Sequence, residues 1–244
     1  MNVPAPLTRP LHLRPCAELA ERVLLPGDPH RALAVAQALT DGPRMFNHAR
    51  GLWGYTGIAR DGAPLTIQAT GIGGPSAAVV CEELIALGAR RLVRIGTCGV
   101  LGSGIEAGEI LAAETVLPAD GTSSALGASA PLRPAQGMLQ AAVAAGARPA
   151  PVVSSDLFYD PREHKLATWA GQGAVAVDGQ AAAVLQVSAR HGVAAACVLG
   201  VTGPAGDPAR RLAGVDELEL LGVRVGELGL RALAGGGPEE ARTR

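Results

Sequence analysis

The chain has 244 residues, of which 48% are hydrophobic and 18% are charged. This balance excludes a disordered chain and predicts a packed globular protein. The formal net charge of -1 and the 2% aromatic content argue against nucleic-acid or anionic-membrane partners, because such partners attract basic proteins and single strands stack on aromatic rings.

Short apolar runs alternate along the chain with segments of helical periodicity. The predicted strands are 22–26, 52–59, 65–70, 92–95, 110–117, 152–155, 174–177 and 194–201. The predicted helices are 29–39, 75–87, 135–145, 162–170, 180–191 and 216–233. Runs such as LVRI at 92–95 and ACVLGV at 196–201 are typical of strands buried on both faces.

This alternation predicts an α/β fold in which helices flank a mixed, largely parallel sheet. No repeat or long linker divides the chain, so we expect a single domain over 1–244. The Gly-, Ser- and Ala-rich stretch 121–130 predicts a surface loop, and 235–244 predicts a frayed tail.

The four cysteines are widely spaced and include no CxxC pair. A zinc site and a disulfide scaffold therefore have no support. The first residues form no apolar signal segment, and no run approaches the roughly 18 apolar residues of a membrane span. We expect a cytoplasmic protein with no metal, no membrane and no nucleic-acid partner.

Three glycine-containing turns each follow a predicted strand and could hold an anion. The first, LPGDPHR at 25–31, opens a helix at Pro29 and places Arg31 near free helical N–H groups. The second, TGIGGPS at 70–76, lacks the glycine spacing of a dinucleotide site and the lysine of a P-loop. In the third, RIGTCG at 94–99, Arg94 lies in an apolar strand, which is costly unless it meets an anion or a carboxylate. Each turn alone could also be an ordinary connection.

Five motifs, in this order and spacing, resemble those of the nucleoside phosphorylase-I family. They are PGDPxR, NHARGLWGYTG, TGIGGPS, VRIGTCG and SSDLFYDP, and the resemblance runs from about His12 to Val201. The family includes hexameric purine nucleoside phosphorylases and uridine phosphorylases. The resemblance implies a nucleoside phosphorylase-like fold and a pentosyltransferase, in which phosphate attacks C1′ of a nucleoside to give ribose 1-phosphate and free base. It implies inorganic phosphate as co-substrate and no cofactor.

On the phosphate side, every matching position carries a suitable residue. The resemblance assigns phosphate to the N–H of Gly27, the guanidinium groups of Arg31 and Arg94, and Thr97, and assigns Arg94 a catalytic role as well. Arg50 matches an arginine that family members lend across a dimer interface. Three arginines around a phosphate dianion would need no Asp or Glu to neutralise them.

On the nucleoside side, the resemblance places His12 near the ribose 5′-hydroxyl of a neighbouring subunit and Phe158 against the sugar and base. An exposed N-terminal histidine and a core phenylalanine are the competing interpretations. The same resemblance implies that the pocket is lined by Cys98, Gly99, Val177, Gly179 and Gln180.

Two parts of the chain depart from the family pattern. Relatives carry Glu-Met-Glu where this chain has Asp178-Gly179-Gln180, so an uncharged amide replaces the carboxylate that grips the ribose hydroxyls. Purine-specific relatives carry an acid for base protonation where this chain has Gly203, and loss of a general acid costs about 10²–10⁴-fold. Asp207 is a candidate substitute with Arg210 or Arg211 nearby, and a solvated loop aspartate is the alternative. We expect the reversions Gln180→Glu and Gly203→Asp to raise activity.

Several functions stay open at this point. We favour a purine nucleoside phosphorylase, because the uracil-reading insertion of uridine phosphorylases is absent after the FY motif. A uridine phosphorylase, a related hydrolase and a non-catalytic homologue that binds phosphate or a phosphosugar are the alternatives. If His12 and Arg50 serve a neighbour's site, the partner is a second copy of the chain, a dimer is the minimum unit, and a hexamer is favoured.

Overall fold

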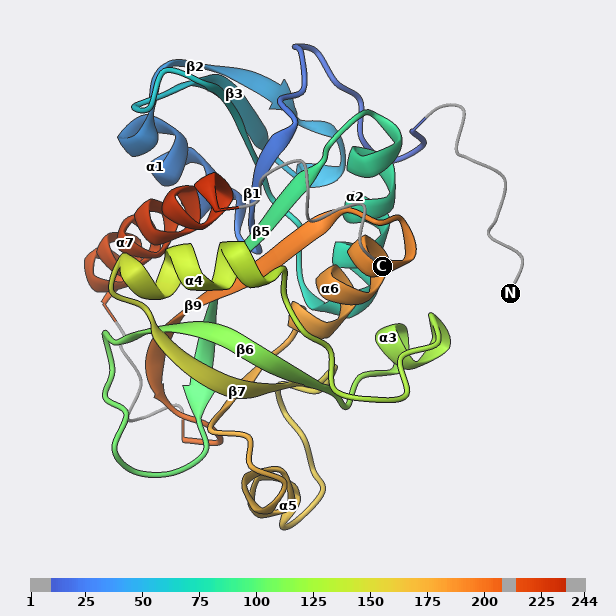
Figure 1. Ribbon diagram of the computed structural model, residues 1–244, viewed down its shortest axis with the longest axis vertical. Helices are drawn as coiled ribbons and strands as arrows, with labels where there is room; N and C mark the ends of the chain where they lie inside the picture. Colours follow the sequence, from blue (N-terminus) through green and yellow to red (C-terminus); the bar gives the residue numbers. More distant parts are fainter. Residues whose placement is uncertain (1–9, 208–213, 236–244) are drawn as a thin grey trace.

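One nine-stranded mixed sheet organises the computed structural model, which describes residues 10–207 and 214–235 (Figure 1). Its strand order is β2-β3-β4-β1-β5-β8-β7-β6-β9. The strands are β1 (Arg22–Pro26), β2 (Thr40–Asn47), β3 (Gly54–Ala59), β4 (Pro64–Gln68), β5 (Arg91–Val100), β6 (Ile110–Pro118), β7 (Arg148–Ser154), β8 (Ala176–Asp178) and β9 (Ala194–Pro204).

Strand β5 is the centre of this sheet. Its first half, Arg91–Ile95, pairs in parallel with β1, and its whole length pairs in parallel with β9. Its last residues, Gly99 and Val100, pair with β8, so β5, β8, β7, β6 and β9 form a closed ring. Because β4, β1, β5 and β9 are mutually parallel, their carboxyl ends share one edge, where ligands of α/β folds bind.

Helices cover both faces of the sheet and enclose two apolar cores (Figure 1). One face carries α1 (Pro29–Leu39), α4 (Gln136–Ala144) and α7 (Val215–Ala234), and the other carries α2 (Gly73–Ala86) and α6 (Ala181–Arg190). The short helices are η1 (Ala49–Gly51), α3 (Gly121–Ala125) and α5 (Lys165–Gly171). The predicted α/β fold with a mixed sheet and flanking helices is confirmed.

Helix α1 begins where its sequence predicts. Asp28 is the N-cap and accepts a hydrogen bond from the His30 N–H at 3.0 Å, and Pro29 occupies the first turn, where no donor is lost. Its buried face is Ala32, Val35, Ala36 and Leu39, which is the i, i+3, i+4, i+7 pattern of an amphipathic helix. This start fixes the direction in which Arg31 leaves the helix.

Glycines let helix α7 approach α1 and the sheet closely. A Cβ built on Gly222 would lie 3.0 Å from the side chain of Arg31, and one on Gly226 would lie 2.9 Å from Val35. A Cβ on Gly229 would lie 2.6 Å from Ile95. Any larger residue at these three positions would push α7 outward, so the glycines hold the stem of Arg31 in place.

The structure corrects two predictions. Strand β2, TDGPRMFN, was not predicted, because Asp41, Gly42 and Pro43 break the apolar pattern; the strand lies at the edge of the sheet and its register with β3 is irregular. The predicted loop at 121–130 begins with α3, which Asp120 caps by accepting from the Ser123 N–H at 2.7 Å. Of the predicted tail, only Gly235 is described; 236–244 lie outside the described residues. Within the described ranges, no helix is both long and apolar enough to cross a membrane.

Candidate functional site

The three predicted anion-holding turns meet at the shared carboxyl edge of β1, β4 and β5. A Cβ built on Gly27, just after β1, would lie 3.3 Å from the carbonyl oxygen of Gly71, which follows β4. It would lie 3.7 Å from Arg94 Nη1 and 3.8 Å from Gln180 Oε1. Residues separated by more than 150 positions in sequence thus surround one point, and only a glycine leaves that point open.

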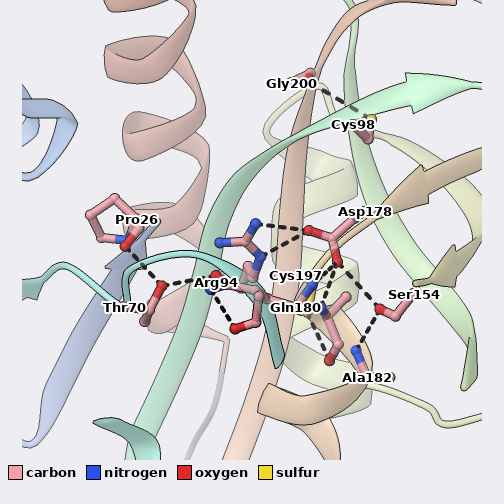
Figure 2. A network of polar contacts seen from close by, with 12 residues as sticks. Pro26, Thr70, Arg94, Cys98, Ser154, Asp178, Gln180, Ala182, Cys197 and Gly200 are labelled. Carbon is pink, nitrogen blue, oxygen red and sulfur yellow. Dashed lines mark hydrogen bonds and ion pairs between the residues drawn. The ribbon is translucent and has the colours of Figure 1, made fainter. Parts of the chain in front are cut away.

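Arg94 reaches this point while bound to a carboxylate. Its side chain is 7% exposed, and its Nε and Nη2 donate to Oδ2 of Asp178 at 3.0 and 2.8 Å (Figure 2). A Cβ on Gly96 would lie 2.6 Å from Arg94 Nη2, so the glycine lets the guanidinium fold back over the strand. The expectation that no arginine of the site is neutralised is wrong for Arg94, because the cost of burying its charge is met by Asp178.

The third nitrogen of Arg94 has a different environment. Nη1 is buried and has no hydrogen-bond partner in the part of the chain that the structure describes. Figure 2 shows it turned away from Asp178, on the side where Pro26 ends β1. Buried donors in proteins are nearly always hydrogen-bonded, so an unpaired guanidinium N–H beside Gly27 indicates a place for an acceptor.

Arg31 adds a second positive charge. Its side chain is partly buried against Gly222 and makes no ion pair within residues 10–207 and 214–235. Burial, and next the charge of Arg94, lower the pKa of Arg31, and Asp28 opposes them in part. An anion beside Arg31 would offset the unfavourable interaction of its charge with that of Arg94.

Thr97, Cys98 and Gly99 continue β5 beyond this cluster. Thr97 is partly exposed, whereas Cys98 is buried, with Sγ 3.8 Å from the carbonyl oxygen of Gly200. A Cβ on Gly99 would lie 3.0 Å from Ala205 Cα, so this glycine permits close packing of the segment that follows β9. Of the three, Thr97 alone presents a partly accessible side chain.

Gln180, predicted to bind the ribose, is engaged with the protein itself. Its Oε1 accepts from Thr70 Oγ1 at 2.8 Å (Figure 2). Its Nε2 donates to the carbonyl oxygens of Gly71 and Gly73 at 2.9 and 3.0 Å. The amide therefore joins the start of α6 to the β4–α2 turn. Gly179 next to it is uncrowded, since its nearest neighbour to a built Cβ is the Ser155 carbonyl oxygen at 3.8 Å.

Gly203 has a backbone reason to be glycine. Its φ is 140°, a conformation that L residues rarely adopt. It lies opposite Gly99, where the register between β5 and β9 shifts. Asp207, the proposed substitute acid, is the last residue described before 208–213, and the predicted helpers Arg210 and Arg211 lie outside the described residues.

The loop that carries Phe158 lies on the surface. Phe158 is 67% exposed and packs edge-on against Tyr159, with ring centroids 5.0 Å apart. The competing interpretation of Phe158 as a core residue is therefore wrong. Val177 is partly buried and packs against the small apolar cluster of Val153, Trp169 and Ala174.

His12 is held by a buried carboxylate that the sequence did not predict. Its Nδ1 lies 2.7 Å from Glu83 Oε1, and the N–H groups of Leu11, His12 and Leu13 all donate to the same carboxylate. Burial alone would raise the pKa of Glu83, but these hydrogen bonds outweigh it and lower the pKa. His12 is 37% exposed, so it is anchored rather than loose.

Arg50 is exposed and held in an unusual backbone conformation. Its φ is 60°, in the left-handed region that non-glycine residues seldom adopt. The buried Asn47 supports this turn, accepting from the N–H groups of Arg14 and Ala49 and donating to the carbonyl oxygen of Leu52. Strain of this kind costs about 1–3 kcal/mol and clusters at functional sites. Among the described residues, no hydrogen bond or ion pair joins Arg50 or His12 to the Gly27–Arg94 cluster.

Comparisons with known proteins find a family model and relatives that match most of the chain. The family model of the phosphorylase superfamily matches residues 21–233. A DeoD-type purine nucleoside phosphorylase from Jannaschia is 35% identical over 194 residues, covering 76% of this chain and 82% of the relative. Another from Caldanaerobacter subterraneus is 34% identical over 200 residues, covering 76% and 83%. A uridine phosphorylase structure from Vibrio fischeri superposes with a TM-score of 0.82 at 23% identity, covering 94% of this chain and 99% of the other.

Proposed function

Because this chain belongs to the phosphorylase superfamily, we propose that it cleaves the N-glycosidic bond of nucleosides with inorganic phosphate. A phosphate oxygen attacks C1′, the C1′–N bond breaks, and its electron pair leaves with the base, which takes up a proton. The products are ribose 1-phosphate and free base, and no cofactor takes part. The observation that carries the proposal is the unpaired, buried Nη1 of Arg94 beside Gly27, with Arg31 close by.

Each residue of the cluster has a role in this reaction. The N–H of Gly27, the guanidinium groups of Arg31 and Arg94, and Thr97 hold phosphate. Positive charge fixed in place before the reaction stabilises charge that moves during it, and such preorganisation is the largest single contribution in many enzymes. Arg94 is then a catalytic residue, since it touches the attacking phosphate.

We propose a purine nucleoside as the substrate, with uridine as the alternative. The relatives above 30% identity are named purine nucleoside phosphorylases, whereas the uridine phosphorylase is similar at 23% identity and bears on the fold alone. The sugar and base would lie over Val177, Gly179 and Gln180, next to Cys98 and Gly99, with Phe158 closing over them.

One panel of substrates tests the proposal. The protein is incubated with inosine, guanosine, adenosine, uridine and thymidine, with and without phosphate, and release of free base is followed. Phosphate-dependent release supports it, and the preferred base decides between the purine and uridine alternatives. Release without phosphate would identify a hydrolase. If no substrate releases its base but phosphate binding is measurable, the protein is a non-catalytic homologue. The hydrogen bonds of Gln180 within the protein are compatible with this outcome.

We propose Asp207 as the acid that replaces the one missing at Gly203. Asp207→Asn should then lower purine phosphorolysis by about 10²–10⁴-fold. A purine nucleoside methylated at N7 serves as the control substrate, because its base leaves without protonation at N7. Its rate of phosphorolysis should fall much less in Asp207→Asn. An unchanged rate with inosine would reject the role of Asp207.

We further propose a homo-oligomer built from dimers, with a hexamer favoured, in which His12 and Arg50 complete a neighbour's site. The strained and exposed Arg50 supports this assignment. We place the protein in the cytoplasm, a compartment in which its four cysteines stay reduced.

A further inference from the structure

Asp178 occupies the junction between β8 and α6, and its carboxylate is fully buried. One oxygen contacts Arg94 and the other contacts the start of a helix (Figure 2). A carboxylate repels phosphate, so Asp178 does not bind the anion directly. Its position is explained by its effect on Arg94.

The contact with Arg94 leaves one side of the guanidinium free. Asp178 Oδ2 accepts from Nε and Nη2, which are the donors on one edge of the planar group. Nη1, on the other edge, is left without a partner in the described part of the chain. Since the guanidinium is rigid and planar, holding one edge fixes the direction of the other.

The carboxylate is itself fixed by the helix. Its Oδ1 accepts from the Gln180 N–H at 2.8 Å, from the Ala181 N–H, and from Ser154 Oγ at 3.3 Å. Ser154 Oγ accepts in turn from the Ala182 N–H at 2.9 Å. A negative charge at a helix N-terminus is favourable, so Asp178 cannot rotate without leaving several donors unpaired.

We propose that Asp178 is a positioning residue that aims Nη1 of Arg94 at the anion beside Gly27. It also removes one unit of the positive charge shared by Arg31 and Arg94, so the two cations can be held close together before phosphate arrives. The inference rests on the proposed function only in naming the anion as phosphate.

A purely structural role predicts something different. If Asp178 only capped α6, loss of its charge would lower stability and leave phosphate affinity unchanged. Ser154→Ala provides the matched control, because it removes bonds to Asp178 and to the Ala182 N–H at the same helix end but makes no contact with Arg94.

Asp178→Asn is the decisive variant. The asparagine oxygen would still accept from the helix N–H groups, so the asparagine NH₂ group would face Nε and Nη2 of Arg94. Because both groups are donors, the guanidinium would move away from its position. We expect the Kd for inorganic phosphate, measured by calorimetry, and the KM for phosphate to rise about ten- to hundredfold, as for loss of a charged hydrogen bond. The KM for the nucleoside should change by no more than about twofold. Asp178→Glu, which keeps the carboxylate, should restore most of the phosphate affinity.

A second experiment, in the Arg94→Lys variant, distinguishes the positioning of residue 94 from an effect on folding. In Arg94→Lys, the side chain has no planar edge for Asp178 to hold, so adding Asp178→Asn should weaken phosphate binding little further. The proposal is overturned if Asp178→Asn lowers Tm as Ser154→Ala does but leaves the phosphate Kd unchanged. It is also overturned if the two effects simply add, or if the wild-type chain binds no phosphate. Phosphate binding without nucleoside cleavage would reject the proposed function while the calorimetric comparison still decides this inference.

Discussion

The phosphate side of the site (Gly27, Arg31, Arg94 and Thr97) and its nucleoside side (Phe158, Gln180 and Gly203) differ in what their polar groups contact. On the phosphate side, Arg31 makes no ion pair in the described ranges and Arg94 keeps one unpaired nitrogen. On the nucleoside side, the amide of Gln180 is hydrogen-bonded to three residues of the β4–α2 turn. The protein thus leaves donors available for an anion but uses the amide of Gln180, the residue predicted to bind the sugar, for its own packing.

This difference bears on how the nucleoside is recognised. A side chain whose hydrogen bonds are already made exchanges them for ligand bonds with little gain. Gly203 offers no side chain, and its φ of 140° disfavours one. If the proposed function holds, selection among nucleosides would fall to the exposed loop that carries Phe158 and to the residues that directly follow β9.

The contrast between the two sides fails if the phosphate side is not essential for activity. Arg31→Ala should lower kcat/KM for phosphate by about 10²–10³-fold, the effect of removing one preorganised donor. The nucleoside KM should change far less. Steady-state rates at varied phosphate measure this, with Arg224→Ala as the control because Arg224 is exposed on α7, the helix against which Arg31 packs. Equal losses in both variants would show that α7, and not the charge of Arg31, is what matters.

The second prediction asks whether the site is shared between subunits. Arg50→Ala and Arg31→Ala should each be nearly inactive alone, but subunits unfolded and refolded together should regain about a quarter of wild-type activity, since half of random dimers would hold one intact site of two. The measurement is the phosphate-dependent rate after mixing. No recovery, with mixed oligomers demonstrated by mass, would place Arg50 in its own subunit's site, whereas an Arg50→Ala variant that is fully active alone would place Arg50 outside any site.

Arg94 was predictable from sequence because the cost of its charge is local. An arginine in the apolar run LVRI must meet an anion or a carboxylate, and Arg94 meets the carboxylate while one nitrogen stays free. Which carboxylate it meets was not predictable, because Asp178 lies 84 positions away in sequence. Only the closure of β5 onto β8 brings the two together.

The same limit applies to Glu83 and Asn47. Both side chains are buried and hold backbone from a distant part of the chain, since Glu83 binds residues 11–13 and Asn47 accepts from the Arg14 N–H. A buried polar residue on a helix or at the end of a strand indicates that a polar partner pairs with it, but not which partner. Most strand limits were predicted to within about four residues, since apolar runs mark them, whereas β5 continues to Val100 beyond its predicted end at Ile95 and β2 lacked such a run.

The third prediction concerns the nucleoside side. The family pattern predicts that Gln180→Glu raises activity, but its contacts predict a cost, because a carboxylate cannot donate to the Gly71 and Gly73 carbonyl oxygens. We expect a loss of about 1–3 kcal/mol in the free energy of unfolding, measured with urea. Gln186→Glu is the control, since its amide makes a single bond of the same kind, to Leu126, on the same helix. Higher activity at unchanged stability would mean that the side chain at position 180 binds the sugar.

The smallest expected effect is on the N-terminal segment and depends on pH. The pKa of Glu83 is lower in the folded chain than its ordinary value of 4.5. Its contribution to stability is therefore complete above that value and is lost as the pH falls through the lowered, folded-state pKa. Hydrogen exchange at the Leu13 amide, which donates to Glu83 at 2.7 Å, should accelerate over this acid range relative to the β5 amides. Glu83→Gln should remove the pH dependence, whereas Glu18→Gln, a change at an exposed residue of the same segment, should keep it. If the Leu13 amide stays protected below the folded-state pKa of Glu83, the charged carboxylate is not what holds His12. Another contact would then have to hold His12 for it to reach a neighbour's sugar.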